Sequence, residues 1–367
     1  MKILVTEHAD HFTQLDFIRE VLLQGADLEI VFRVGPTQKY WVKLLHPDPS
    51  VLALSSKNRI WRECRFYLRV LLKGFRSDFI IVNTGPENES FKLTLLALLV
   101  YLPHKSKLIY TVRNPIKYSE IFVGKRRLSF ARALFITLSS RLMFESEQVR
   151  TEVYSSFPST RTKVSAVAYG RFSDKRLIAE SRKSKSKFFT LGLLGTVSSQ
   201  RRDYGSLVEA LNLLDPKLRE AIRICFLGGT DAKDSNHWVE TFKSEFEVLE
   251  NSQKWLSKEK FLELGLKCDA LLSPLNLDSK LYGNGQSTAS FGDAIALGKA
   301  LIIPRAADQH GEFSSFCFYY SSVAQLADSL AKLMENNSIR LLDSSIFEKY
   351  SREKQFDNWF AGILAKH

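Results

Sequence analysis

The stretch GLLGTVSSQRRDYGSLVEALNLL, residues 192–214, has the pattern of a buried strand, a polar loop and a helix. The apolar run ends at Gly195, and apolar residues at helical spacing begin near Tyr204. A short apolar run joined to a helix by a polar loop is typical of a parallel sheet, in which a crossover helix follows each strand. The stretch therefore predicts an α/β fold.

The same alternation extends in both directions along the chain. Apolar runs of strand length recur between stretches with helical spacing, at residues 2–6, 28–34, 78–83 and 107–112 and again at 188–195, 222–229, 270–275 and 300–304. Two successive α/β units predict two Rossmann-like parallel-sheet domains that face a cleft.

The length and a composition shift divide the chain. Of the 367 residues, 45% are hydrophobic, which is more than a single core usually accommodates. Residues 173–187, SDKRLIAESRKSKSK, are rich in Ser and Lys, as linkers are. We expect a first domain over residues 1–175, a second over 188–350, and a C-terminal helix at 351–367 that packs back on the first domain.

Other features indicate a cytoplasmic protein. The four cysteines are far apart, which favours neither a zinc site nor a disulfide framework and fits a reducing compartment. The N-terminal MKILVTEHAD turns acidic too early for a signal peptide. The apolar run at residues 94–102 has about half of the roughly 20 residues that span a bilayer, and we expect it to form a buried or interfacial helix.

The charge is unevenly distributed. The net charge is +12; residues 1–189 have 32 Lys and Arg against 17 Asp and Glu, or +15, and residues 190–367 have 20 against 23, or −3. A basic first half suits an anionic membrane surface or a polyanionic substrate, and no nucleic-acid motif accompanies it. Residues 61–75 predict an amphipathic helix that either covers the sheet or touches a membrane.

Two loops of the second half have residues suited to a nucleotide. Arg201 and Arg202 follow a predicted strand, where binding sites of parallel sheets lie, and their forked donors suit phosphate oxygens; the alternative is a solvated surface pair. Gly228 ends the strand within IRICFLGGT, residues 222–230. A glycine there allows a ribose or base to approach closely, or serves only a tight turn.

A third stretch, GNGQSTASFGDAIALGKALIIPR at residues 283–305, predicts the start of a helix after small polar residues. Backbone N–H groups and the positive end of the helix dipole form an anion site there. Asp293, about three residues into the helix, would then reach ribose hydroxyls. Alternatively Ser290 caps the helix and Asp293 pairs with its dipole. The expected donor-binding residues of this stretch are Gly285, Ser287, Thr288, Ser290 and Asp293.

These motifs together resemble the GT-B fold of nucleotide-sugar-dependent glycosyltransferases, in particular those of bacterial polysaccharide and lipopolysaccharide synthesis. The similar segments are FESEQVR (144–150), GTVSSQRRDYGSLVEAL (195–211), FLGG (226–229), CDALLSPLN (268–276) and DAIALGKALIIP (293–304). The resemblance implies that Gly195, Arg201 and Arg202 hold the diphosphate and that Asp293 binds the ribose.

One position departs from that family. Many retaining members have two glutamates eight positions apart; here Asp293 stands at the later position and Gly285 at the earlier one. The paired-glutamate signature is therefore absent, and the retaining or inverting outcome stays open.

By the same resemblance the first domain binds the acceptor. Polar residues follow its predicted strands, and a carboxylate or His within about 3 Å of an acceptor hydroxyl could act as general base. We select His8 and Glu87 for that role from a set that also includes Glu7, Asp10, His11, Glu89, Arg113 and Asn114.

The resulting hypothesis is a glycosyltransferase with a nucleotide diphosphate-sugar donor, a lipid-linked or polysaccharide acceptor, and neither a metal nor another cofactor. Its basic first domain predicts peripheral association with an anionic membrane surface at the cytoplasmic face. Two alternatives are a catalytically silent subunit that binds a sugar nucleotide or polysaccharide, and a nucleotide-sugar epimerase on a related two-domain fold.

Overall fold

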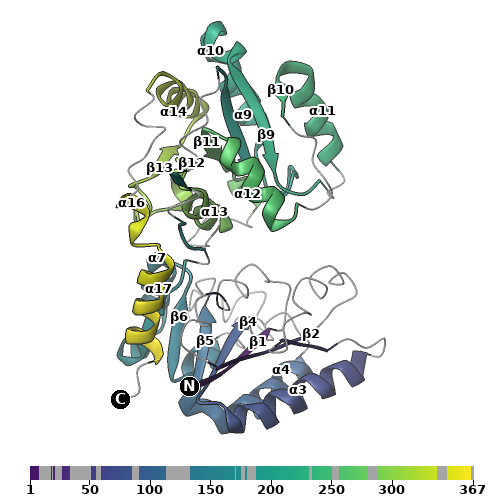
Figure 1. Cartoon of the computed structure of the whole chain (residues 1–367), viewed down its shortest axis with the longest axis vertical. Coiled ribbons are helices and arrows are strands. Elements are labelled where there is room, and N and C mark those ends of the chain that lie inside the picture. Colours follow the sequence, from purple (N-terminus) through teal and green to yellow (C-terminus); the bar gives the residue numbers. More distant parts are fainter. Residues whose placement is uncertain are drawn as a thin grey trace. The chain divides into compact units, whose positions relative to one another are not determined.

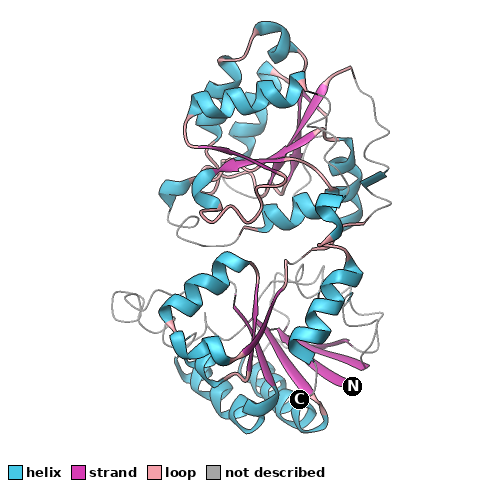
Figure 2. Cartoon of the chain, turned by 90° about the vertical axis from the view of Figure 1, so that its left-hand side faces the viewer, coloured by secondary structure: helices cyan, strands magenta, loops and turns pink. Residues whose placement is uncertain are grey.

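The computed structural model divides the chain into two compact units, Met1–Gly170 with Glu353–His367, and Arg171–Arg352. Figure 1 shows the chain, and Figure 2 shows helices on both sides of the strands in each unit. The residues that the structure describes are 1–7, 18, 20, 27–33, 51–54, 59–84, 91–112, 133–169, 171–174, 178–179, 187–230, 234–249, 256–279, 288–336 and 345–364.

The first unit is built on a parallel sheet in the order β3-β2-β1-β4-β5-β6-β7. Its chain order reverses between β1 and β4. All five residues of β5 are buried, as expected of a strand covered on both faces. The strands are β1 (Lys2–Glu7), β2 (Asp27–Arg33), β3 (Val51–Leu54), β4 (Phe79–Thr84), β5 (Leu108–Val112), β6 (Arg141–Phe144) and β7 (Val164–Val167).

Helices pack on this sheet through their apolar faces. Phe66, Tyr67 and Val70 of α3 enter the same core as Tyr101 and buried residues of β4 and β5, which confirms that the helix expected at residues 61–75 covers the sheet. The helical turn at Phe360–Leu364 lies against β6 and β7, and Trp359, just before it, is fully buried. The helical elements are α3 (Arg59–Arg76), α4 (Phe91–Tyr101), η2 (Leu102–Lys107), α7 (Glu147–Ser156), η3 (Pro158–Thr162), α17 (Arg352–Trp359) and the π-helical turn η6 (Phe360–Leu364).

The second unit is built on a parallel sheet in the order β10-β9-β8-β11-β12-β13. Its chain order reverses between β8 and β11, as it does between β1 and β4 in the first unit. The strands are β8 (Phe189–Leu194), β9 (Ile222–Leu227), β10 (Glu247–Val248), β11 (Ala270–Leu272), β12 (Leu301–Pro304) and β13 (Cys317–Tyr320).

The helices of the second unit begin at side-chain caps in several places. Asp203, Asp215, Ser257, Thr288 and Ser322 each accept a hydrogen bond from a backbone N–H of the first turn. The helical elements are α9 (Tyr204–Asn212), α10 (Pro216–Glu220), α11 (Ser235–Glu245), α12 (Lys258–Lys267), η4 (Leu277–Ser279), α13 (Ala289–Leu297), η5 (Arg305–Ala307), α14 (Val323–Glu335) and α16 (Ser345–Glu348).

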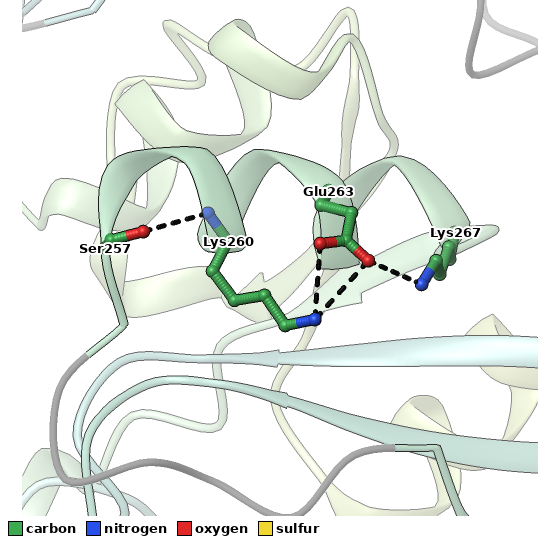
Figure 3. Close-up of polar contacts among 4 residues, drawn as sticks. All are labelled: Ser257, Lys260, Glu263 and Lys267. Carbon is green, nitrogen blue, oxygen red and sulfur yellow. Dashed lines mark hydrogen bonds and ion pairs between the residues drawn. The ribbon is translucent and has the colours of Figure 1, made fainter.

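Helix α12 shows how one helix combines local and tertiary contacts. Ser257 accepts from the N–H of Lys260, and the carboxylate of Glu263 pairs with Lys260 and Lys267 on the exposed face (Figure 3). These hydrogen bonds lower the pKa of Glu263. On the other face a Cβ added at Gly265 would lie 2.5 Å from the side chain of Leu297, so the glycine lets α12 approach α13 closely.

The eight strands expected from the sequence are all present, and their ends agree within one or two residues except at β11, which ends at Leu272, three residues before the expected end. Among the described residues the structure has five further strands that were not predicted, β3, β6, β7, β10 and β13, each of only two to four residues. Within the described part of the chain, no helix is long and apolar enough to cross a bilayer.

Candidate functional site

The carboxyl ends of β8 and β11 mark the switch point of the second sheet. Ligands of open parallel sheets bind outside the carboxyl ends of the strands, where the strand order reverses. The loop after β8 contains Gly195, and the loop after β11 contains Ser273. The candidate site is therefore built from these two loops and from α13, which follows them in the chain.

Gly195 and Gly228 pack backbone against backbone at the ends of β8 and β9. Gly195 has a φ of 86°, which favours glycine. A Cβ added at Gly228 would lie 1.8 Å from the carbonyl oxygen of Gly195. Gly228 is thus required by the packing of the strand exits, a role that needs no ligand.

The guanidinium of Arg202 packs against Gly195, and the residue is only 5% exposed. Its Nε donates to the carbonyl of Leu194 at 2.9 Å, and its Nη1 donates to that of Arg201 at 3.0 Å. A Cβ added at Gly195 would lie 1.7 Å from Nη2 of Arg202. The guanidinium therefore fills the space that this glycine leaves and stabilises the loop after β8.

The loop after β8 is also hydrogen-bonded to the loop after β11. The N–H of Asp203 donates to the carbonyl of Pro274 at 2.7 Å, and the N–H of Asn276 donates to that of Arg201 at 3.1 Å. These bonds fix the backbone of Arg201 at the switch point, and its side chain is exposed. The two arginines predicted together thus differ: Arg202 faces inward, and Arg201 is accessible to an anion.

The start of α13 confirms a helix terminus at this place but changes its cap. Thr288 is the N-cap and accepts from the N–H of Ser290 at 3.4 Å, so the alternative in which Ser290 caps the helix is wrong. Ser290 instead donates from its hydroxyl to Ser273 at 2.8 Å and lies 3.1 Å from the hydroxyl of Thr288. This buried chain of three hydroxyls ties the helix start to the end of β11.

Asp293 lies in the second turn of α13, as its fifth residue, rather than the third position expected. Nη2 of Arg171 lies 3.5 Å from its Oδ1. Burial raises the pKa of Asp293 above its usual range, although Arg171 and Arg202 act to lower it. A partly buried carboxylate beside two guanidinium groups can accept hydrogen bonds from sugar hydroxyls.

Arg171 was not predicted as a site residue. It precedes Asp293 by more than a hundred positions and lies next to the Ser- and Lys-rich stretch read as a linker, so no local pattern identifies it. The ion pair exists only because the start of the second unit folds back on α13.

The first unit has a polar pair at its own switch point. Glu7 ends β1 and Asn83 lies near the end of β4; both are buried, and Nδ2 of Asn83 donates to Oε2 of Glu7. The hydroxyl of Tyr101, in α4, donates a hydrogen bond at 2.8 Å to the hydroxyl of Thr6, which precedes Glu7 in β1. Glu7 was among the residues considered from the sequence, although His8 and Glu87 were selected. Those two residues, together with Gly285 and Ser287, lie outside the described residues.

Comparison with known proteins identifies the fold. No protein-family model and no curated protein matches the chain. Solved structures match over almost its whole length. HepE of Anabaena, solved in complex with UDP and glucose, is 14% identical, with 97% of each chain covered and a TM-score of 0.65.

Two other matches are the lipopolysaccharide outer core galactosyltransferase WaaB and a UDP-GlcNAc 2-epimerase from Neisseria meningitidis bound to UDP-GlcNAc. WaaB is 14% identical, with 99% of each chain covered and a TM-score of 0.63. The epimerase is 12% identical, with 99% of this chain and 100% of its own covered and a TM-score of 0.63. The chain therefore has the GT-B fold that the resemblance implied.

Proposed function

We propose that the chain is a glycosyltransferase that moves a sugar from a nucleotide diphosphate-sugar to an acceptor hydroxyl. The observation that carries the proposal is the meeting of three elements at one switch point: the glycine loop after β8 with Arg201, the capped start of α13, and Asp293 with its partner Arg171. Diphosphate, ribose and sugar carry the charges and hydroxyls that such a set of groups can bind.

Each group has a role that follows from its position. The positive end of the α13 dipole and the exposed Arg201 would bind the diphosphate. Asp293 would accept hydrogen bonds from ribose hydroxyls, and Arg171 would hold its carboxylate in place. Arg202 would keep the Gly195 loop in its shape and add positive charge without contacting solvent.

The reaction is a substitution at the anomeric carbon. The bond between the anomeric carbon and the phosphate oxygen breaks, and the nucleoside diphosphate leaves with the bonding electrons. The acceptor oxygen forms the new bond to the anomeric carbon, and the proton of the acceptor hydroxyl passes to a base. Fixed charges and dipoles at the diphosphate stabilise the departing group, so the proposal includes no metal and no other cofactor. His8 and Glu87 are the proposed bases.

The first unit would present the acceptor. Residues 1–170, which form most of this unit, have 25 Lys and Arg against 15 Asp and Glu, or +10. This charge favours an anionic acceptor, such as a glycan carried on a lipid diphosphate during surface polysaccharide assembly. A lipid-linked acceptor would place the enzyme at the inner face of the membrane as a peripheral protein.

Two other functions have support of their own. The match to a UDP-GlcNAc 2-epimerase over the full length of both chains favours an epimerase. Gly285, at the position where many retaining family members have a glutamate, favours a catalytically silent binding subunit.

A binding screen followed by a turnover assay separates the three. A thermal-shift screen of nucleoside diphosphates and their sugars identifies the nucleotide, because a ligand of the folded state raises the Tm. We then expect purified protein to release free nucleoside diphosphate from the sugar nucleotide when acceptor is present, and Arg201→Met to slow this. Isomerised sugar nucleotide would identify an epimerase. Binding without either reaction, whatever the acceptor, would identify the silent subunit.

A further inference from the structure

Helix α3 of the first unit has two apolar faces. Phe66, Tyr67 and Val70 form the buried face, which packs on the sheet. The opposite face is exposed although it is apolar: Trp61 is 63% exposed, Leu68 56%, Leu72 53% and Phe75 64%. A helix that only covered a sheet would have polar residues at these positions.

The exposed residues form one continuous stripe. They are spaced seven, four and three positions apart, which places them on the same side of a helix with 3.6 residues per turn. Leu99 of α4 and Leu102 of η2 are exposed as well, so six of the eight large apolar side chains that are most exposed in the described residues belong to these three elements. Single exposed apolar residues are ordinary, but a cluster marks an interaction surface.

Basic residues border the stripe. Helix α3 has six basic residues and one acidic one, or +5, and that acid, Glu63, is buried beside Arg62. Arg65, Arg69 and Arg76 are exposed, and none of the three forms an ion pair with a described residue. The ring of Phe75 contacts that of His104, 4.7 Å between centroids, so η2 with its exposed Lys105 borders the end of α3.

We propose that this surface, formed by the exposed residues of α3, α4 and η2, docks on a lipid bilayer that contains anionic headgroups. The apolar stripe would enter the boundary between headgroups and acyl chains, and the arginines would contact lipid phosphates, as in helices that lie in the membrane plane. A second copy of the chain is a poorer occupant, because a two-fold interface would bring the arginine rows of the two copies together. This inference names the surface for the proposed membrane association, but it rests on α3 and stands even if no nucleotide binds.

The test uses the full-length protein without nucleotide and two vesicle compositions, phosphatidylcholine alone and phosphatidylcholine with about 30% phosphatidylglycerol. We expect cosedimentation with the anionic vesicles at about 0.1 M salt and weaker binding at 1 M, where the screening length falls from about 10 Å to about 3 Å. The triple variant Trp61→Ser, Leu72→Ser, Phe75→Ser should lower the partition coefficient at least about tenfold. The matched control Leu213→Ser, at an exposed leucine of the second unit, should bind as the wild type does.

Cys64 provides a local reporter, because it is exposed on α3 while the other three cysteines are buried. An environment-sensitive dye on Cys64 should shift to the blue when anionic vesicles are added. The same dye on a Leu213→Cys, Cys64→Ser variant should not shift.

Three results would overturn the inference: no binding to anionic vesicles, equal binding by wild type and a correctly folded triple variant, or self-association that the same substitutions abolish while vesicles have no effect. Each concerns α3, whereas failure of the nucleotide screen would overturn only the proposed transferase.

Discussion

Nη2 of Arg171 lies 3.5 Å from Oδ1 of Asp293, and this ion pair joins the first residue of the second unit to its α13 helix. Two opposing effects act on the carboxylate. Burial raises its pKa, and the guanidinium groups of Arg171 and Arg202 lower it, with burial the larger of these effects. The charge at Asp293 therefore costs stability in the folded protein, as is common at sites built to bind a ligand.

Asp293→Asn should separate stability from binding. A carboxyl group whose pKa is raised in the folded state contributes stability below its unfolded pKa, about 3.9, and loses that contribution as the pH rises through its folded value. Asparagine has no such dependence. We expect the Tm of the variant, relative to wild type, to increase from pH 4 to pH 7, while affinity for the nucleoside diphosphate falls about tenfold or more. A Tm difference that stays constant over this range would contradict the prediction.

The two neighbouring arginines should differ in what they stabilise. Arg202→Met removes donors to the carbonyls of Leu194 and Arg201 and should lower the free energy of unfolding by about 2–4 kcal/mol, measured by urea denaturation. Arg201→Met replaces an exposed side chain, so its stability should stay within about 0.5 kcal/mol of wild type, while calorimetry should show weaker nucleotide binding. Equal losses of stability in the two variants would disprove this division of roles.

Gly228 and Gly205 form a matched pair of glycines. A Cβ at Gly228 would meet the backbone carbonyl of Gly195 at 1.8 Å, and backbone cannot move aside as a flexible side chain can. We expect Gly228→Ala to cost more than about 2 kcal/mol. At Gly205, in the first turn of α9, the nearest atom is 3.7 Å away, so Gly205→Ala should be neutral or stabilising by up to about 1 kcal/mol. Thermal melting of both variants checks the contrast.

Two N-cap residues with the same expected contribution to stability allow the effect on nucleotide binding to be separated from the effect on stability. Thr288→Ala at α13 and Ser257→Ala at α12 each remove an N-cap and should each cost about 1 kcal/mol. Only Thr288 lies at the switch point, in the hydroxyl chain with Ser290 and Ser273. We therefore expect nucleotide affinity to fall in Thr288→Ala and to be unchanged in Ser257→Ala. Affinity lost equally in both would indicate that stability alone is responsible.

The sequence by itself determined the two α/β units, because buried parallel strands need continuous apolar runs and their covering helices need apolar residues at helical spacing. These local patterns identified eight strands, the helix at residues 61–75, the loop of Gly195 and Arg201 after a strand, and the helix that contains Asp293. Short strands such as β3, β10 and β13 were not predicted, because two to four residues are too few to show a hydrophobic pattern.

Only the tertiary structure decided which of these residues meet and which way they face. In the folded protein Arg171 forms an ion pair with Asp293. Arg202 is buried, whereas Arg201 is exposed. Gly228 packs against the backbone of Gly195. The tertiary structure also showed that the second apolar face of α3 is uncovered. The physical reason is that side-chain spacing along the chain reports local geometry, whereas contacts between distant segments and their burial depend on strand order and on how helices pack across the sheet.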